Sequence, residues 1–338
     1  MEPMMRNVPP RPAAATLLQP LCLLALALSL PGATARAAEA WPQRAVRLLV
    51  PVAPGGASDF TARLVGQKLS EAFGQNVVID NRAGAAGIIA TEIVARATPD
   101  GHTFLVSSNT THGIGPVLYR KLPYDAMKDF THVGLVATIP TVMVVHPSVP
   151  AASVRDFVAL AKAKPDGYSF ASSGGGSSSR LLGELFKITT GAPLTHVPYK
   201  GSGLATVDLT AGSVHVMFDG LPSHSASIRA GRLRVLAVLW PKRSAVLPDV
   251  PTMAEAGYPA VEGALWYGLS GPAGLPRPVV DRLSAELRRI TTLEDVVARL
   301  ASVGAFPSPM GPAEYTQFIR VENARWGPVV RASGATAD

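Results

Sequence analysis

Two glycine-rich turns carry the residue types best suited to hold a small anion. Residues 54–59 (PGGASD) follow the apolar run 46–52, and residues 172–179 (SSGGGSSS) follow a second strand-like run. Each turn precedes an amphipathic helical pattern. Glycine lets the backbone approach a ligand, and a helix start leaves N–H groups unpartnered at the positive end of the helix dipole. The pair therefore predicts one anionic ligand held between two loops.

The residues of these turns differ in what they could contribute. Ser58 is a natural hydroxyl donor to a carboxylate, whereas Asp59 would either cap the helix or contact the ligand. The first turn could also be a plain strand–helix connection. Three consecutive glycines are entropically costly, so ligand contact explains the second turn better, with Gly175 expected to lend its N–H and a positive φ. A third turn, 81–87, has only G-x-x-G spacing and is interpreted as a connection.

Motifs of catalysis and of metal binding do not fit this chain. It has no G-x-S-x-G elbow and no phosphate-binding P-loop motif. The seven histidines include no H-x-x-x-H pair, so neither a metal nor another cofactor is implied. A serine nucleophile needs a base within hydrogen-bond reach, and no histidine spacing suggests one. We therefore expect a protein that is not an enzyme, with an exported hydrolase as the alternative.

Three further residues received structural interpretations. Lys200 could meet an anion, but an exposed turn lysine is the simpler assignment. Trp266 and Trp326 are expected to serve hinge and core packing rather than to form a ligand platform.

The composition is that of a folded protein with real cores. The 338 residues are 47% hydrophobic and 16% charged, with a formal net charge of +7. This content argues against wholesale disorder. No block of Lys and Arg marks a nucleic-acid arm, so no nucleic-acid partner is expected.

The N-terminus has the pattern of a secretory signal peptide, predicted over residues 1–40. Arg6 and Arg11 precede the apolar stretch 17–30, and two A-x-A sites follow within 35–40. The stretch is short for a membrane span, although an uncleaved anchor is the alternative. Cys22 is the only cysteine and lies in this segment, so the mature protein would hold no disulfide or thiol. We expect export to the periplasm.

The rest of the chain alternates between strands and amphipathic helices, which is typical of parallel α/β sheets. Residues 130–146 form a long β-branched stretch that could cross from one block to another. Residues 263–270 form a second one that could cross back.

Several segments, taken in order, resemble the Bug, or TctC-like, substrate-binding proteins, the extracytoplasmic receptors of tripartite tricarboxylate transporters. The likeness covers nearly all of the mature chain and is carried by Trp41-Pro42, Val50 to Asp59, Asn81 to Gly87, Pro99 to Thr103, His196 to Gly201, Leu247 to Gly257, Trp266 to Leu269 and Glu322 to Val330. The sequence departs from the family pattern at Ala83, where proline is common, and at Arg180, where histidine is common.

The resemblance implies a two-lobed, type II-like periplasmic-binding-protein fold, with two Rossmann-like lobes joined by two crossing strands. Residues 41–141 and 264–338 would form lobe 1, and residues 142–263 lobe 2. It also implies a ligand cleft built from the two loops, in which backbone amides hold a carboxylate. The residues carried over are Gly55, Gly56, Ala57, Ser58, Asp59, Ser173, Gly174, Gly175, Gly176, Ser177, Ser178, Ser179, Tyr199 and Asp219.

The expected function is capture of a small carboxylate, an organic acid or an amino acid, for uptake by integral-membrane transporter subunits. A ligand receptor for a sensor kinase is the second alternative. We expect the protein to act as a monomer.

Overall fold

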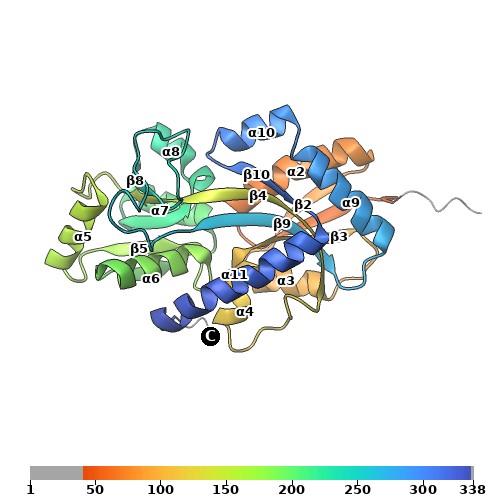
Figure 1. The fold of residues 1–338 in the computed structure, drawn as a ribbon, viewed down its shortest axis with the longest axis horizontal. Coiled ribbons are helices and arrows are strands. Elements are labelled where there is room, and N and C mark those ends of the chain that lie inside the picture. The colour runs from red at the N-terminus through yellow and green to blue at the C-terminus, as the bar shows by residue number, and fades with distance from the viewer. Residues whose placement is uncertain (1–40, 336–338) are drawn as a thin grey trace, which may run out of the picture. The chain divides into compact units, whose positions relative to one another are not determined.

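Two sets of parallel strands flank a pair of long antiparallel strands in this α/β fold (Figure 1). The structure is a computed structural model and describes residues 41–335; the predicted signal peptide lies outside the described residues. The strands are β1 (Val46–Val50), β2 (Val77–Asn81), β3 (Thr103–Ser108), β4 (Phe130–Val145), β5 (Ser169–Ser172), β6 (Thr195–Pro198), β7 (Val216–Gly220), β8 (Arg234–Val238), β9 (Ala264–Pro272) and β10 (Phe306–Met310).

Helices connect most of these strands. They are α2 (Ala57–Phe73), η1 (Ala85–Gly87), α3 (Ile88–Ala95), η2 (Asn109–Ile114), α4 (Gly115–Leu118), α5 (Val154–Ala163), α6 (Ser178–Thr190), α7 (Ser202–Ala211), η3 (Leu221–Ser223), α8 (Ser225–Arg229), α9 (Arg277–Ile290), α10 (Glu294–Ala301) and α11 (Pro312–Ser333). Within residues 41–335, no helix is both long and apolar enough to cross a membrane.

The sheet order explains how the two halves of the molecule are joined. The strands run β2-β1-β3-β9-β4-β7-β5-β6, with β1, β2 and β3 mutually parallel and β5, β6 and β7 mutually parallel. The strand β4 pairs with β9 along residues 130–140 and then with β7 and β8 along residues 141–145. The prediction of a two-lobed fold with two crossing strands is confirmed.

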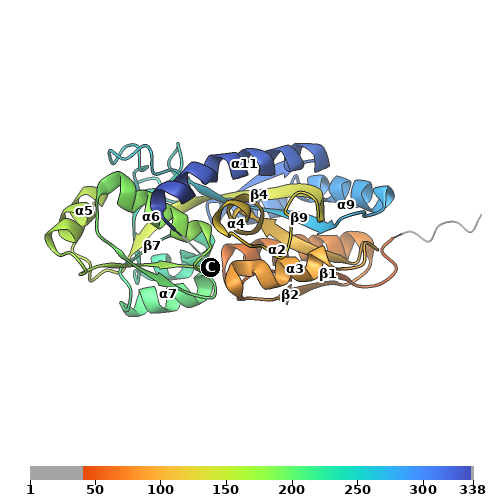
Figure 2. The ribbon, with the colours of Figure 1, turned by 90° about the horizontal axis from the view of Figure 1, so that it is seen from below.

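Each parallel set has a core made by a helix that follows one of its strands. On α2, Val65 and Leu69 are buried in one apolar cluster with Leu48 of β1. On α6, Phe186 stacks on Phe218 of β7 with ring centroids 5.0 Å apart. Figure 2 shows α6 and α7 at one end of the molecule and α2 and α3 at the other. This packing holds the strands of each set in place, so the loops at their carboxyl ends can reach a common site.

Helix α11 is tied to the crossing strand β9 by a buried carboxylate. Glu322 accepts hydrogen bonds from the indole nitrogens of Trp266, at 2.9 Å, and Trp326, at 3.2 Å. Both tryptophans are only 2% exposed, which agrees with the packing role predicted for them. Their N–H groups have been removed from water, so the carboxylate that accepts them stabilises this end of the fold.

Replacing Glu322 by alanine should lower the free energy of unfolding by about 2–4 kcal/mol, because two buried indole N–H groups would lose their acceptor. Glu322→Gln keeps an acceptor oxygen and should lose less than half as much. Urea unfolding of the two variants measures the difference. Equal losses in the two variants would contradict this role for the acceptor.

Candidate functional site

A cleft lies where the carboxyl ends of the two parallel strand sets face each other. Its outer cavity has a volume of about 250 Å³, and its inner cavity one of about 30 Å³. The two are parts of one cleft, because both are lined by Pro51, Val52, Ala86, Thr110 and Ser173. Ligands of open parallel sheets bind outside the carboxyl ends of the strands, so the cleft has the position expected for a binding site.

Most of the remaining lining residues come from loops and helix starts that follow individual strands, whereas Ser108, Pro198, Asp219, Leu265 and Tyr267 lie within strands. The outer cavity is completed by Gly84, Ala85, Gly87, Gly174, Gly175, Ser177, Pro198, Tyr199 and Lys200. The inner cavity is completed by Gly56, Ala57, Ser58, Ser108, Ser178, Ser202, Asp219, Leu265 and Tyr267.

Three helix N-termini converge on the inner cavity. Its lining includes Ala57 and Ser58 of α2, Ser178 of α6 and Ser202 of α7, each of which lies in the first turn of its helix. The N–H groups of a first helical turn have no intrahelical acceptor and carry the positive end of the dipole. The inner cavity therefore favours a negatively charged group.

The hydroxyl of Ser58 faces this cavity without a partner of its own. Ser58 is 4% exposed, and its Oγ has no hydrogen-bond partner among the described residues. A buried hydroxyl without a partner destabilises a protein by about 1–3 kcal/mol. A ligand oxygen in the inner cavity would supply the missing hydrogen bond.

Asp59, the other candidate side chain of the first turn, is bound to its own lobe. Its carboxylate accepts hydrogen bonds from the N–H of Gly55 (3.1 Å), from Arg63 (3.0 Å) and from Asn81 (3.0 Å). Burial alone would raise the pKa of Asp59, but these hydrogen bonds outweigh it and lower the pKa. Of the two interpretations for Asp59, the structure supports the structural one: it fixes the loop. Neither Asp59 nor Gly55 lines the cleft.

In the second loop, two serines hold the loop rather than face the cleft with free hydroxyls. Ser177 donates to the carbonyl of Gly174 at 2.7 Å, and its Oγ accepts from the N–H of Arg180. The Oγ of Ser179 accepts the N–H of Ser173 at 2.8 Å. Ser179 does not line either cavity, so its role is to set the position of Ser173.

The glycines of this loop have different roles from those expected. Positive φ belongs to Gly174 (φ 152°) and not to Gly175, so that part of the prediction for Gly175 is wrong. A Cβ on Gly174 would lie 3.4 Å from the carbonyl oxygen of Tyr199. Gly176 does not line the cleft, and a Cβ there would lie 2.3 Å from the hydroxyl of Tyr119. Steric packing explains Gly176, and backbone conformation explains Gly174.

Tyr199 and Arg180 do not line the inner cavity, and both form hydrogen bonds that hold neighbouring segments of the cleft. Tyr199 lines the outer cavity, but its hydroxyl donates to Asp208 at 2.8 Å and so points to its own lobe. Arg180 donates from Nη1 to the carbonyl of Gly175 at 2.6 Å. The guanidinium thus holds the triple-glycine loop from behind.

Asp219 is the acidic side chain of the inner cavity. It lies near the end of β7, is 2% exposed, and its Oδ2 has no hydrogen-bond partner in the described part of the chain. Burial raises the pKa of Asp219 to about 6, although nearby groups, with Ser202 first among them, counteract part of the effect. Its Oδ2 lies 3.7 Å from Nε2 of His224. Burial lowers the pKa of His224 to about 3, which keeps the imidazole neutral.

Several lining residues had been given no binding role by the sequence. The turn that ends in Gly84, Ala85, Ala86 and Gly87 had been interpreted as a connection, yet all four line the outer cavity. Ala85 and Ala86 have positive φ values of 44° and 49°, which is strained for residues with a Cβ. The signal that could have found this loop was its position after a strand and before a helix, which it shares with the other two turns.

Lys200, Ser202 and Thr110 also line the cleft, although none of them was among the predicted binding residues. Lys200 is exposed as expected but also lines the outer cavity. Ser202 begins α7 after the turn that follows β6. Thr110 lies in the π-helical segment η2, and its Oγ1 accepts the N–H of Ser178 at 3.4 Å. No motif marks Thr110, because its position beside Ser178 depends on the contact across the cleft between the segments that follow β3 and β5.

A serine–histidine pair lies near the second loop but does not reach the cleft. Ser172 is within 2.7 Å of Nε2 of His196, and its hydroxyl donates to the carbonyl of Gly174. Ser172 is fully buried and lines neither cavity. This pair is therefore not placed to attack a ligand in the cleft. The described residues also include no group of three His, Cys, Asp or Glu that could hold a metal ion.

Comparison with known proteins agrees with this geometry. Residues 61–335 match the model of the TctC family, described as the tripartite tricarboxylate transporter family receptor. The chain belongs to the TctC family. BugT of Bordetella pertussis is 38% identical over 299 residues, which cover 88% of this chain and 92% of BugT.

Two solved structures of similar proteins contain carboxylates. Rpa4515 of R. palustris, solved with adipate, is 38% identical with a TM-score of 0.86, and the match covers 88% of this chain and 99% of that one. MatC of Rhodopseudomonas palustris, solved with bound malate, is 35% identical with a TM-score of 0.82, covering 86% and 100%. This TctC family member thus shares its fold with one protein solved with adipate and one solved with bound malate.

Proposed function

We propose that this protein captures a small carboxylate in the cleft between its lobes and presents it to the integral-membrane subunits of a tripartite transporter. The observation that carries the proposal is the convergence of the N-termini of α2, α6 and α7 on the inner cavity. Backbone N–H groups at helix starts bind a carboxylate without a charged side chain. The carboxylates bound by Rpa4515 and MatC support the same ligand class.

The lobes that would close on the ligand are proposed as residues 41–141 with 264–338, and residues 142–263. The first contributes residues of the loops after β1, β2 and β3, and the second contributes residues of the loops after β5 and β6 together with Asp219 of β7. Ligand that contacts both lobes shifts the population towards the closed arrangement, which the membrane subunits would recognise. In this proposal the chain acts as a monomeric, non-catalytic receptor and reaches the periplasm through a signal peptide over residues 1–40.

The proposed binding residues are those that line the cleft. From the predicted set they are Gly56, Ala57, Ser58, Ser173, Gly174, Gly175, Ser177, Ser178, Tyr199 and Asp219, to which the structure adds Thr110, Ser202 and the loop that contains Ala86. The other predicted residues, Gly55, Asp59, Gly176 and Ser179, would act by holding these loops in place.

A thermal-shift screen tests the proposal. At least one member of a panel of mono-, di- and tricarboxylates and amino acids should raise the melting temperature, because a ligand at 100 times its Kd adds about 2.7 kcal/mol to stability. The matching amide of the best ligand is the control and should have no effect, since it lacks the charge that the helix N-termini favour. If no carboxylate stabilises the protein, the proposed ligand class is wrong.

A further inference from the structure

The inner cavity presents a carboxyl group to a ligand that is itself expected to be a carboxylate. Asp219 lines this cavity and is only 2% exposed, and its Oδ2 has no hydrogen-bond partner among the described residues. No lysine or arginine stands among the residues that line the inner cavity. Two carboxylates close together in a buried site cannot both be ionised without a large electrostatic cost. One of them must therefore carry a proton when the ligand is bound.

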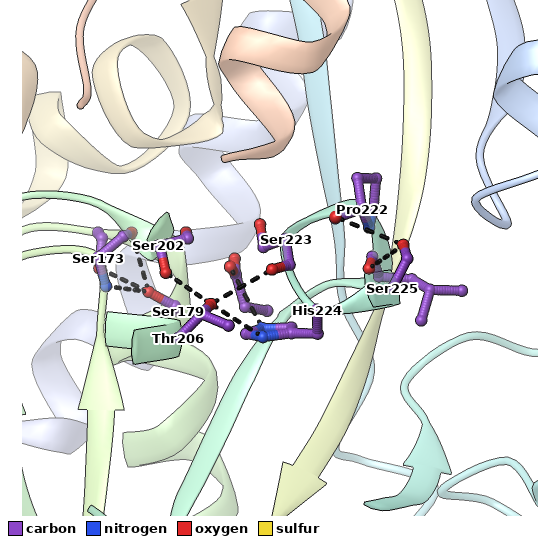
Figure 3. A network of polar contacts seen from close by, with 11 residues as sticks. Ser173, Ser179, Ser202, Thr206, Pro222, Ser223, His224 and Ser225 are labelled. Carbon is purple, nitrogen blue, oxygen red and sulfur yellow. Dashed lines mark hydrogen bonds and ion pairs between the residues drawn. The ribbon is translucent and has the colours of Figure 1, made fainter. Parts of the chain in front are cut away.

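The neighbouring histidine indicates which group holds that proton. The hydroxyl of Thr206 donates to the carbonyl of Ser202 at 2.7 Å, so its lone pairs remain to accept from Nδ1 of His224, 3.1 Å away (Figure 3). This assigns the imidazole hydrogen to Nδ1 and leaves a lone pair on Nε2. That lone pair lies 3.7 Å from Oδ2 of Asp219. Two acceptors that face each other repel, and the repulsion is stronger when the carboxyl is ionised, so the lone pair on Nε2 favours the neutral form of Asp219.

No other nearby group offers the charge that would keep Asp219 ionised. The residues of β4 and β5 that pair with β7 carry no titratable side chain. From β9, Tyr267 presents a phenol whose pKa is raised by burial and by Asp219. On α2, Asp59 is bound to Arg63, and on α6, Arg180 donates to the carbonyl of Gly175. Burial raises the pKa of Asp219 and outweighs the hydrogen bonds of Ser202, Gly220 and Ser223, which lower it. The helix N-termini also favour the ionised carboxylate, so the neutral form depends on burial and on the lone pair of His224.

We propose that Asp219 contacts the ligand as a neutral carboxylic acid and donates its proton in a hydrogen bond to the ligand carboxylate. Capture of the anion then takes up a proton from solution whenever Asp219 is ionised in the ligand-free protein. The inference rests on the proposed function, since it requires a carboxylate in this cleft. It makes Asp219 a specificity-determining residue that favours carboxylates over ligands bearing a cation at this position.

The pH dependence of binding has a definite sign. Burial raises the pKa of Asp219 to about 6, so most of the ligand-free protein carries an ionised Asp219 above that pH. If only the protonated form binds the anion, affinity should fall about 20-fold between pH 6.5 and pH 8. An ammonium or other cationic group held by ionised Asp219 would give the opposite trend, with affinity rising as the pH rises.

Titration calorimetry with malate and adipate tests the inference on the unmodified protein. At pH 7, binding in buffers of different ionisation enthalpy should reveal uptake of about 0.9 proton per ligand. Asp219→Asn should bind with no proton uptake and with affinity that is constant from pH 6.5 to pH 8. Asp295→Asn is the matched control, because Asp295 lies on α10 and lines neither cavity. The hydrogen bond to Lys68 lowers the pKa of Asp295, so its proton is absent throughout this range. The proton uptake of Asp295→Asn should equal that of the unmodified protein.

The outcomes separate this inference from the proposed function. Carboxylate binding without proton uptake, or with proton release, overturns the inference and leaves carboxylate capture standing. Uptake that persists in Asp219→Asn assigns the proton to another group and also overturns it. If no carboxylate bound to the unmodified protein or to Asp295→Asn, although both remained folded, the proposed function and the inference would be overturned together.

Discussion

Replacing Gly203 by alanine should weaken carboxylate binding by about 10- to 100-fold while leaving the ligand-free protein folded. A Cβ on Gly203, at the start of α7, would lie 2.6 Å from the carbonyl oxygen of Pro54 in the loop between β1 and α2. That oxygen belongs to the backbone and cannot move aside cheaply. Overpacking of this kind typically destabilises a packed arrangement by about 1–3 kcal/mol, and 1.4 kcal/mol corresponds to a tenfold change.

The effect should fall on binding because Gly203 and Pro54 belong to opposite sides of the cleft. Alanine has a higher helix propensity than glycine, so α7 itself is not weakened. Leu204→Ala, at the neighbouring and half-exposed position of α7, is the matched control and should bind normally. Calorimetry measures affinity, and thermal unfolding without ligand measures the fold. If Gly203→Ala bound its ligand as tightly as the Leu204→Ala control, the close contact between Gly203 and the carbonyl of Pro54 would not limit closure of the cleft.

Compared with the unmodified protein, Asp219→Asn should gain stability as the pH rises from acid to neutral. Burial raises the pKa of Asp219 to about 6 from its ordinary value of 3.8. A carboxyl with a raised pKa stabilises the folded state below its unfolded pKa, and this contribution is lost as the pH rises through the folded value. The unmodified protein should therefore lose about 2 kcal/mol from this group between pH 4 and pH 7. Asparagine does not titrate and avoids the loss.

Unfolding in urea at a series of pH values measures this difference. The free energy of unfolding of Asp219→Asn minus that of the unmodified protein should rise by about 2 kcal/mol from pH 4 to pH 7. Asp59→Asn should change in the opposite direction, because the lowered pKa of Asp59 stabilises the fold above its unfolded pKa. A difference for Asp219→Asn that stays flat over this range would show that the carboxyl does not titrate with a raised pKa.

The two substitutions probe different steps of one proposed event. Gly203 governs how closely the backbones of the two sides can approach, as judged from its distance to Pro54. Asp219 governs the protonation state of the inner cavity that this approach encloses. Closure removes water, which strengthens every hydrogen bond and every charge repulsion inside the cleft. Both Gly203→Ala and Asp219→Asn should then bind the ligand more weakly, and only Asp219→Asn should change the pH dependence of binding.

Much of the fold could be predicted because it follows from local patterns. The run 46–52 ends in a glycine turn and an amphipathic helix, and the structure has β1 and α2 there. The long stretch 130–146 was predicted to cross between blocks, and β4 pairs with β7 of one set and with β9, which in turn pairs with β3 of the other. Residue spacing decides such features, since periods of 2.0 and 3.6 residues determine which faces can be buried.

The site was predicted only in part. Ser58 and Ser173 were expected in a cleft and line it, because glycine-rich strand–helix turns mark the carboxyl ends of parallel strands. The roles of Gly174 and Gly175 were not separable, since the residue type alone does not tell which glycine needs positive φ. Asp59 and Ser179 look like ligand contacts in the sequence, yet each accepts a backbone N–H and so holds its loop.

The sequence by itself determined the strands, the helices, the glycine turns and the family resemblance, since these depend on residues that are neighbours along the chain. Only the tertiary structure decided that Thr110, Ser202 and Asp219 meet in one cavity, because they follow three different strands and are joined by the crossing of β4 and β9. It also decided the environment of Asp219. The pKa of a carboxyl depends on its burial and on the groups around it, and these are set by the packing of distant segments.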